Sequence, residues 1–287
     1  MGARRHRYLG CHVSASGGLE QALVNGQALG VNTIQLHPSP PQRWNTKPYP
    51  KDFEAKFLEL RASSGIERVF FHGVYLINLA NPDPQQLHLS KSSLLHYLDL
   101  SVRIGGDGVI FHVGSAKHVS DEAEAYTRAA EAINWIMERV EGKARLLLEV
   151  AAGSGSIIGD RVEELAEIYR QVDDKARVGF ALDSQHLWAS GYDLAAELDG
   201  VIQNIDEAFN LSKVWAIHLN DSKTERGSHK DRHENLGEGL IGRAALRRFV
   251  NHPKLTTIPF ILETPGLKDT ESAQREVEAL HALAADG

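Results

Sequence analysis

Short apolar runs alternate with longer amphipathic stretches along most of the chain. The apolar runs are rich in Val, Ile, Leu and Phe without strict alternation, which is typical of parallel strands covered on both faces. These runs span Tyr8–His12, Thr33–Leu36, Arg68–His72, Gly108–Val113, Arg145–Val150, Val178–Asp183, Val214–Leu219 and Pro259–Glu263. Helical patterns lie between them, for example over Phe53–Ser63, Ser92–Ile104, Glu122–Val140, Val162–Val172 and Gly242–Val250. Eight such units predict an α/β fold, a closed (β/α)8 TIM barrel, in preference to an open doubly wound sheet.

Composition agrees with one barrel and bears on the cellular setting. The chain has 287 residues, of which 42% are hydrophobic and 24% charged, so we expect a single domain over residues 1–287. Cys11 is the one cysteine, which excludes an intramolecular disulfide. No apolar run has the length of a signal peptide core or of a membrane span. We therefore expect a cytoplasmic monomer that does not contact membranes.

The formal net charge of −7 counts against nucleic-acid binding, because phosphate contacts need Lys and Arg. Bound divalent cations would offset part of this charge, and local basic patches matter more than the total.

Ionisable residues close seven of the eight predicted strands. TIM barrels carry their active sites at the C-terminal ends of the strands. A lone His there is more often a hydrogen-bonded structural residue, and a lone carboxylate is often a helix cap. A barrel, however, brings all of them around one mouth, where crowded carboxylates repel one another unless cations lie between them. The residues at or next to the strand ends are His12, His72, His112, Glu149, Asp183, His218 and Glu263.

Two further segments add ligands near the same mouth. His186 follows Asp183 by three residues, and Asp231 and His233 lie in the loop after the seventh strand. Imidazole nitrogen mixed with carboxylate oxygen suits zinc, with Mn²⁺ or Fe²⁺ as alternatives. Nine candidates are too many for one tetrahedral ion and favour two or three metals that share a carboxylate. The nine are His72, His112, Glu149, Asp183, His186, His218, Asp231, His233 and Glu263.

A series of short motifs runs in one order from Tyr8 to about Glu263. Its members are HVSASGG at 12–18, HGVYLINL at 72–79, FHVGS at 111–115, LE at 148–149, LDSQH at 182–186, GYD at 191–193, IHLNDSK at 217–223, DRHENLGEG at 231–239 and ILET at 261–264. Together they resemble the endonuclease IV family, the zinc-dependent apurinic/apyrimidinic endonucleases also called AP endonuclease family 2. One such motif would be weak, but the whole series in order is specific.

The resemblance implies three zinc ions and assigns ligands to them. His72 and His112 would hold one ion, and Glu149 would bridge it to a second. Asp183, His218 and Glu263 would complete the second site. The third site would consist of His186, Asp231 and His233.

The resemblance also implies a reaction and a substrate. The reaction would be hydrolysis of the phosphodiester 5′ to an abasic site, leaving a 3′-hydroxyl, in base excision repair. A metal-bridging hydroxide would attack, with Glu149 and Glu263 as the catalytic carboxylates that position metals and hydroxide. The partner would be double-stranded DNA with abasic or 3′-blocked lesions.

Two loops at the predicted mouth are candidates for DNA contact. Arg43 and Trp44 follow the second strand, and Tyr75 and Leu76 follow the third. Such side chains can wedge into a base stack, although Trp44 and Leu76 fit loop packing equally well. Lys230 is the candidate for a phosphate contact.

The chain departs from the family pattern at a few positions. Val150 stands where the family usually has Asn, Ser184-Gln185 replaces Thr-Cys, and the loop at 37–44 differs from the family's DNA-probing segment. We expect these departures to affect substrate choice more than metal binding, with one hydrogen bond beside the metals weakened because Val150 lacks the amide.

Two rival functions fit parts of the pattern. A sugar isomerase or epimerase uses a similar barrel but holds one or two metals with fewer His, so the loop ligands His186, Asp231 and His233 favour the nuclease. A non-catalytic DNA-damage binder would lack part of the ligand set, and none of the nine positions is lost. The number of bound metal ions distinguishes the nuclease from the isomerase or epimerase, and a nicking assay distinguishes it from the non-catalytic binder.

Overall fold

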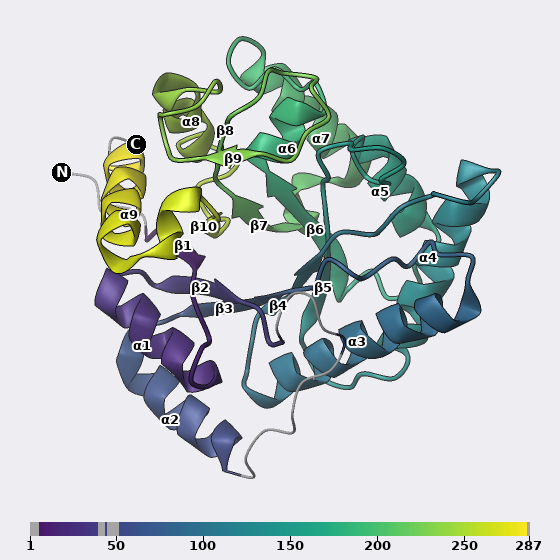
Figure 1. The fold of residues 1–287 in the computed structure, drawn as a ribbon, viewed down its shortest axis with the longest axis horizontal. Helices are drawn as coiled ribbons and strands as arrows, with labels where there is room; N and C mark the ends of the chain where they lie inside the picture. Colours follow the sequence, from purple (N-terminus) through teal and green to yellow (C-terminus); the bar gives the residue numbers. More distant parts are fainter. Residues whose placement is uncertain (1–5, 40–43, 45–51, 286–287) are drawn as a thin grey trace.

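The strands form a closed parallel barrel with helices on the outside (Figure 1). The computed structural model describes residues 6–39, 44 and 52–285. Around the barrel the order is β1, β2, β3, β4, β5, β6, β7 and β10, and β10 closes the ring against β1. The barrel strands are β1 Leu9–His12, β2 Thr33–Leu36, β3 Arg68–His72, β4 Gly108–Phe111, β5 Arg145–Glu149, β6 Val178–Asp183, β7 Val214–His218 and β10 Phe260–Leu262.

Helices connect the strands and cover the outside of the barrel. They are α1 Leu19–Leu29, α2 Phe53–Ser64, α3 Pro84–Arg103, α4 Glu122–Met137, α5 Val162–Arg170, α6 Ser184–Ala189, α7 Leu198–Phe209, α8 Arg243–Val250 and α9 Thr270–Ala284. Two short 3-10 helices, η1 Leu211–Lys213 and η2 Pro265–Lys268, precede β7 and α9. A small antiparallel hairpin, β8 Asp221–Ser222 and β9 His233–Glu234, lies in the long loop after β7. None of the helices in the described residues is both long and apolar enough to cross a membrane.

Strand residues alternate between two apolar layers. Those that point outwards, such as Phe71 and Phe111, belong to the large cluster packed under the helices. A separate small cluster collects one residue from each of six strands, and we assign it to the barrel interior, since alternate strand residues face opposite sides. Its members are Phe70, Ile110, Leu147, Ala181, Ala216 and Ile261.

The TIM barrel expected from the sequence is confirmed, and each predicted strand is present with bounds that differ by no more than two residues. The largest helix difference is α3, which begins at Pro84 and not at Ser92. The Asp83 carboxylate accepts hydrogen bonds from the N–H groups of Gln85 and Gln86, and Pro84 fits the first turn, so this helix starts earlier than its apolar face indicates.

Candidate metal centre

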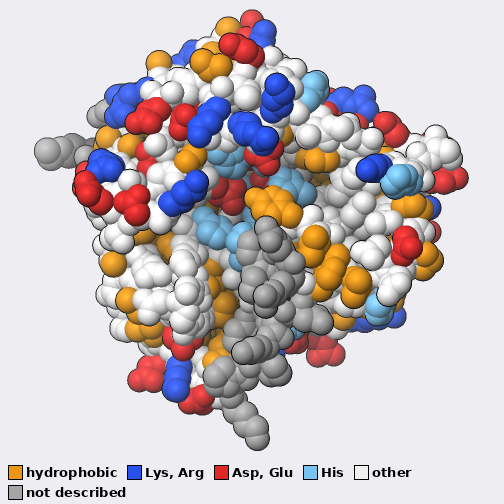
Figure 2. All heavy atoms as spheres, in the orientation of Figure 1, with side chains coloured by type: hydrophobic (Ala, Val, Ile, Leu, Met, Phe, Trp, Pro, Cys, Tyr) orange, Lys and Arg blue, Asp and Glu red, His pale blue; other side chains and the backbone are white. Residues whose placement is uncertain are grey.

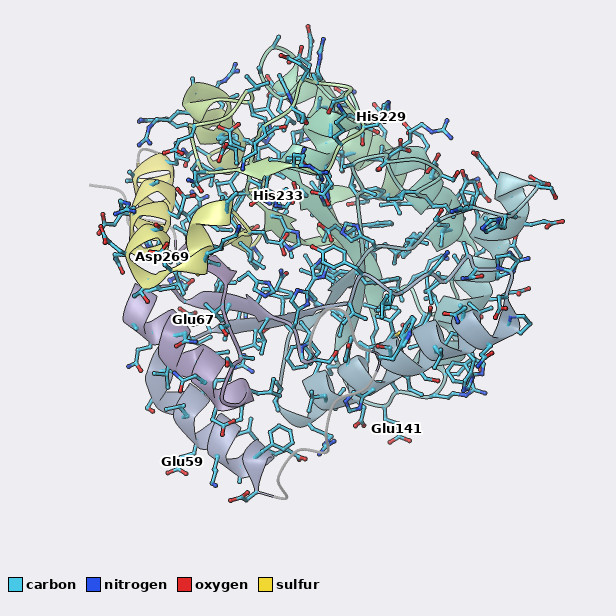
Figure 3. The ribbon with its side chains drawn as sticks, in the orientation of Figure 1. Glu59, Glu67, Glu141, His229, His233 and Asp269 are labelled. Carbon is cyan, nitrogen blue, oxygen red and sulfur yellow. The ribbon has the colours of Figure 1, made fainter. Side chains whose placement is uncertain are left out.

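The strand period explains why so many ligands point at one another. Each strand-end ligand lies two residues beyond a residue of the interior cluster, so both occupy the inward face. His72, for example, follows Phe70, and Glu149 follows Leu147. The six residues that obey this rule are His72, His112, Glu149, Asp183, His218 and Glu263. The remaining three come from α6 and the hairpin loop: His186, Asp231 and His233. In Figure 3, His233 on β9 lies above the barrel opening, whereas Glu59 and Asp269 lie at the periphery.

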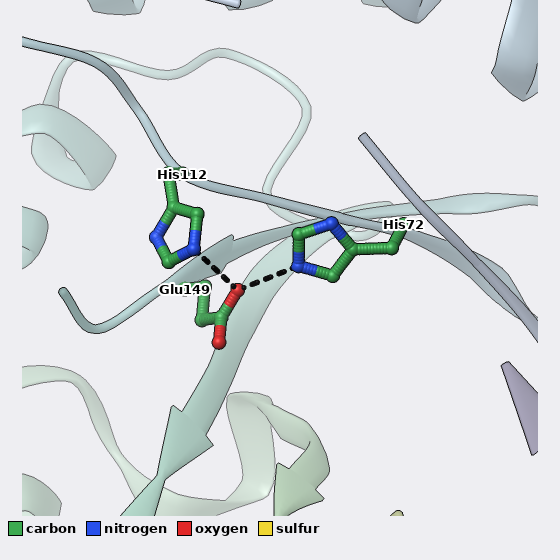
Figure 4. Close-up of side chains that lie close together, drawn as sticks. All are labelled: His72, His112 and Glu149. Atoms are coloured by element: carbon green, nitrogen blue, oxygen red, sulfur yellow. Dashed lines mark hydrogen bonds and ion pairs between the residues drawn. The ribbon is translucent and has the colours of Figure 1, made fainter. Parts of the chain in front are cut away.

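The first group of possible ligands consists of His72, His112 and Glu149 (Figure 4). One ligand atom from each lies within 4.8 Å of the others. The Nε2 atom of His72 is 3.0 Å from Oε2 of Glu149, and that of His112 is 3.5 Å from the same oxygen. The second nitrogen of His72 is 2.7 Å from the carbonyl oxygen of Gly73, which orients the ring.

The second group shares Glu149 with the first. It contains Glu149, Asp183, His218 and Glu263, again with ligand atoms within 4.8 Å of one another. His218 lies among the carboxylates, with Nδ1 at 2.7 Å from Glu149 Oε1, 3.3 Å from Glu263 Oε2 and 3.8 Å from Asp183 Oδ2. Glu149 thus directs one oxygen to each group, the arrangement that a bridging carboxylate needs.

The third group contains Asp183, His186 and His233. The Nε2 atoms of His186 and His233 are 3.4 Å apart, and Oδ1 of Asp231 is 3.5 Å from the first and 3.3 Å from the second. Asp183 faces the second and third groups, which the sequence did not indicate. All nine predicted ligands therefore lie in one connected cluster, and its mixed nitrogen and oxygen donors fit divalent transition metals such as zinc.

The charges of the cluster hold Glu149 and Glu263 ionised. Burial would raise the pKa of Glu149, which has no exposed surface, but the charges of His112 and His218 outweigh burial and keep that pKa well below its usual range. Burial would likewise lower the pKa of His218, but Glu263 and Glu149 raise it to about 9. The pKa of Glu263 falls to about 2, because His218 and His72 outweigh its burial. Ionised carboxylates are ready to bind a metal ion, and a metal ion that binds here would displace the proton from a neighbouring imidazole.

Two uncharged side chains that the sequence analysis missed support these ligands. Gln35, from the middle of β2, lies 2.7 Å through Oε1 from Nε2 of His218 and donates through Nε2 to Glu263. Asn220 donates through Nδ2 to Asp183 Oδ2 at 2.7 Å and accepts at Oδ1 from the backbone N–H of Glu263 at 2.9 Å. Both side chains are fully buried. The sequence signal for Gln35 is an amide between two apolar strand residues, Ile34 and Leu36.

The imidazole of His186 is oriented even though position 150 is Val. The side chain of Val150 is fully buried, and the carbonyl oxygen of Val150 is 2.9 Å from Nδ1 of His186. The hydrogen bond that orients this imidazole therefore uses the backbone and is independent of the side chain at position 150.

His12 and His37 lie beside the cluster without joining any of the three groups. Their rings are 4.6 Å apart, and the ring of His37 is 5.4 Å from that of His72. Burial and the neighbouring histidines lower the pKa of His12 to about 3, and burial and His72 lower that of His37 to about 4, so both imidazoles are neutral at physiological pH. The sequence pattern places His12 at a strand end, whereas His37 carries no such signal.

The candidate DNA-contact residues differ in exposure. Tyr75 and Leu76 project into solvent from the turn after β3, with 70% and 41% of their surface exposed. Trp44 is half-buried and packs against the main core cluster. The Lys230 side chain is exposed, and no carboxylate of the described residues is within ion-pair distance of it. Arg43 lies outside the described residues.

The surface around the cluster is hollowed, with histidine and acidic side chains at its bottom and Lys and Arg side chains gathered along one side (Figure 2). The loop between β8 and β9 carries four cations: Lys223, Arg226, Lys230 and Arg232. Lys223 and Arg226 are paired with Glu234 and Asp193, respectively.

Known proteins resemble this chain over nearly its whole length. Residues 24–283 match the protein family described as "Xylose isomerase-like TIM barrel". "Probable endonuclease 4" of Clostridium botulinum (strain Alaska E43 / Type E3) is 36% identical over 273 residues, which cover 95% of this chain and 97% of that relative. "Apurinic-apyrimidinic endonuclease" of Caenorhabditis elegans is also 36% identical, over 92% of this chain and 68% of the relative.

Solved structures give the same family and a wider fold class. The crystal structure of endonuclease IV from Thermus thermophilus superposes with a TM-score of 0.86 at 30% identity, covering 98% of this chain and 100% of that one. A D-tagatose 3-epimerase-like protein superposes with a TM-score of 0.74 at 15% identity, over 97% of both chains, which is a likeness of fold alone.

Proposed function

Because this chain belongs to the endonuclease IV family, we propose that it is a DNA-repair endonuclease that hydrolyses the phosphodiester 5′ to an abasic site and leaves a 3′-hydroxyl. The observation that carries this proposal is the connected set of three ligand groups in one barrel mouth, with Glu149 and Asp183 each common to two groups. Such a set suits three zinc ions held side by side.

The residues of the mouth divide the chemical work. Divalent ions held there would lower the pKa of coordinated water and neutralise charge on the phosphoryl oxygens. Glu149, fully buried, directs its two oxygens to different groups and so fixes their spacing. Glu263 presents a charged carboxylate between His218 and Gln35 at the exposed edge of the cluster, where substrate arrives. These two are the proposed catalytic carboxylates.

Substrate recognition would use the exposed side chains around the mouth. Tyr75 and Leu76 are suited to enter the gap that a missing base leaves in the stack. Lys230, with an exposed ammonium group and a backbone carbonyl held by Gln185 at 2.9 Å, is suited to a phosphate. Arg43 and Trp44 remain candidates in the loop after β2. The packing of Trp44 against the core cluster counts against a DNA contact by this side chain.

The sugar isomerase or epimerase alternative has the barrel itself in its favour, since epimerase-like structures share the fold. The third ligand group argues against it, because one or two metals would leave His186, Asp231 and His233 without an ion to bind. Identity above 30% is found here with endonuclease relatives, whereas the epimerase-like structure is only 15% identical.

A nicking assay with matched duplexes tests the proposal. The zinc-loaded protein is incubated with a duplex that carries one abasic analogue and with the same duplex without the lesion. We expect one nick on the 5′ side of the lesion, a product end that a polymerase extends, and no cut in the intact duplex. Uncut abasic duplex, together with turnover of a ketose by the same preparation, would reject the nuclease in favour of the epimerase.

A further inference from the structure

A buried carboxylate, Asp221, lies at the start of the loop that carries the third ligand group. Asp221 is the first residue of β8 and has no exposed surface. Its Oδ1 accepts hydrogen bonds from the backbone N–H groups of Ser222 at 2.8 Å, Ile241 at 2.9 Å and Gly242 at 3.2 Å. Its Oδ2 accepts from the N–H of Gly237 at 3.0 Å. Four donors from both ends of one loop thus converge on one side chain.

The returning end of the loop is wrapped tightly around this carboxylate. A Cβ atom on Gly239 would lie 2.6 Å from Asp221 Oδ1 and 2.5 Å from the carbonyl oxygen of Ser222, so only glycine fits there without displacement. The N–H of Leu240 donates to the same Ser222 carbonyl at 2.8 Å, which closes the turn over the carboxylate. The turn at 237–242 is therefore held by the carboxylate, and the carboxylate is enclosed by the turn.

The same segment carries the ligands of the third group. In the hairpin, Asp221 pairs with Glu234 and Ser222 pairs with His233. A hairpin with only two residues in each strand is unstable by itself in water, so its geometry depends on the contacts that anchor its ends. Asp221 anchors both ends, because it belongs to β8 and binds the chain that follows β9. The directions of His233 and of nearby Asp231 therefore depend in part on this side chain, beside the hydrogen bond from Gln185 to the Lys230 carbonyl and the contact of His233 Nδ1 with the Glu263 carbonyl.

We propose that Asp221 is a positioning residue for the third ligand group. It touches none of the three groups and acts through the hairpin, holding His233 and Asp231 opposite His186. The inference rests on the proposed function in so far as it takes this group to hold a metal ion. In this role Asp221 differs from Gln35 and Gly73, which contact ligands of the second and the first group directly.

The substitution Asp221→Asn tests the inference with little change of shape. One end of the amide becomes a donor, which cannot accept from the Gly237 N–H, and the negative charge at the centre of the turn is lost. The control is Glu238→Gln, which removes a carboxylate from the same loop at an exposed position. Zinc is titrated into the metal-free full-length chain against a chromophoric chelator, which gives the number and the affinity of the bound ions.

The expected result is that Asp221→Asn weakens one of three zinc ions by about 10- to 100-fold and leaves the other two at wild-type affinity. Excess zinc should restore nicking of abasic duplex, which a general loss of folding would not allow. The control should bind three ions like the wild type. Wild-type affinity for all three ions in Asp221→Asn, or equal weakening of all three in the folded variant, overturns the inference.

A second variant covers the case in which Asp221→Asn does not fold. Gly239→Ala pushes the turn away from Asp221 and retains the carboxylate, so it should weaken the same single ion. If it binds three ions normally, the inference fails while the proposed function stands. A wild-type chain that holds no third ion overturns both together.

Discussion

Glu149 owes its place in two ligand groups to its position on β5. It lies on the inward face at the strand end, two residues beyond Leu147, and is completely enclosed. Its Oε2 is 3.0 Å from His72, and its Oε1 is 2.7 Å from His218. A buried carboxylate without partners would be costly, so the surrounding imidazoles, or metal ions bound by them, are a condition of its burial.

Of the two proposed catalytic carboxylates, Glu263 is the one whose charge can be removed with less harm to folding, because Glu149 has no exposed surface. Glu263 lies at the edge of the cluster with 18% of its side chain exposed, and its backbone N–H is held by Asn220. We predict that Glu263→Gln leaves thermal unfolding close to wild type and lowers the single-turnover nicking rate at least about a hundredfold, because the shape remains and the charge beside the metals is lost.

The control for Glu263→Gln is Glu59→Gln, an exposed glutamate on α2 at the periphery of the molecule (Figure 3). It should nick at the wild-type rate. Near-normal nicking by Glu263→Gln would mean that the second ligand group is wrongly assigned.

How far the sequence predicts the site depends on the kind of residue. The strand-end ligands could be predicted because period-two alternation places them on the face of the interior residues, as in the step from Ala216 to His218. The amide of Gln35 is visible in its strand, but its role could not be predicted, since that role depends on β2 lying beside β1 and on Gln35 reaching His218 across the barrel. Asp221 has the same difficulty, because its partners are backbone groups up to 21 residues away.

The loops after β3 and β7 face the same mouth with different chemistry. The first presents Tyr75 and Leu76 to solvent, and the second presents Lys230 among other cations. An aromatic wedge reads the gap left by a missing base, whereas an ammonium group binds any phosphate. The two loops should therefore contribute separately to lesion selectivity and to general affinity.

Substitutions in the two loops should separate these contributions. We predict that Tyr75→Ala weakens binding to abasic duplex by roughly 1–3 kcal/mol and leaves intact duplex unaffected, since one base–aromatic stack is lost. Lys230→Ala should weaken both duplexes about equally and reduce the salt dependence by about one phosphate contact. Equilibrium binding to both duplexes at two salt concentrations measures this, with bound metal as a second readout.

The control for these loop variants is Lys143→Ala, which removes an exposed charge just before β5, at the opposite end of the strands. It should change neither affinity nor salt dependence appreciably. If Tyr75→Ala loses metal, or weakens both duplexes alike, Tyr75 is a structural residue of its loop and not a wedge.

Helices are less predictable than strands in this chain. In α1, Gly26 interrupts the apolar face, and a Cβ atom there would lie 2.5 Å from Ile34. This glycine lets the helix pack closely on the strand. The low helix propensity of glycine, however, argues against predicting a helix here from the sequence. In α3, the start is set by Asp83 and Pro84 and not by the apolar pattern. Tertiary packing and capping thus decide what periodicity leaves open.

Charge is distributed unevenly over the molecule, although the formal total is negative. The formal net charge is −7, yet Lys and Arg side chains gather beside the hollow that contains the ligand groups (Figure 2). The hollow itself brings together four of the acidic side chains: Glu149, Asp183, Asp231 and Glu263. Metal ions bound there would offset part of that negative charge, which a DNA backbone would otherwise meet.

We propose that this mouth cuts DNA with ions held by all three ligand groups. The most direct measurement is to strip the protein with a strong chelator, return zinc stepwise, and record ions per chain by elemental analysis together with the nicking rate on abasic duplex. We expect no nicking by the stripped protein and a full rate only as the third ion per chain is bound. A full rate with two ions per chain, or with fewer, would contradict this expectation.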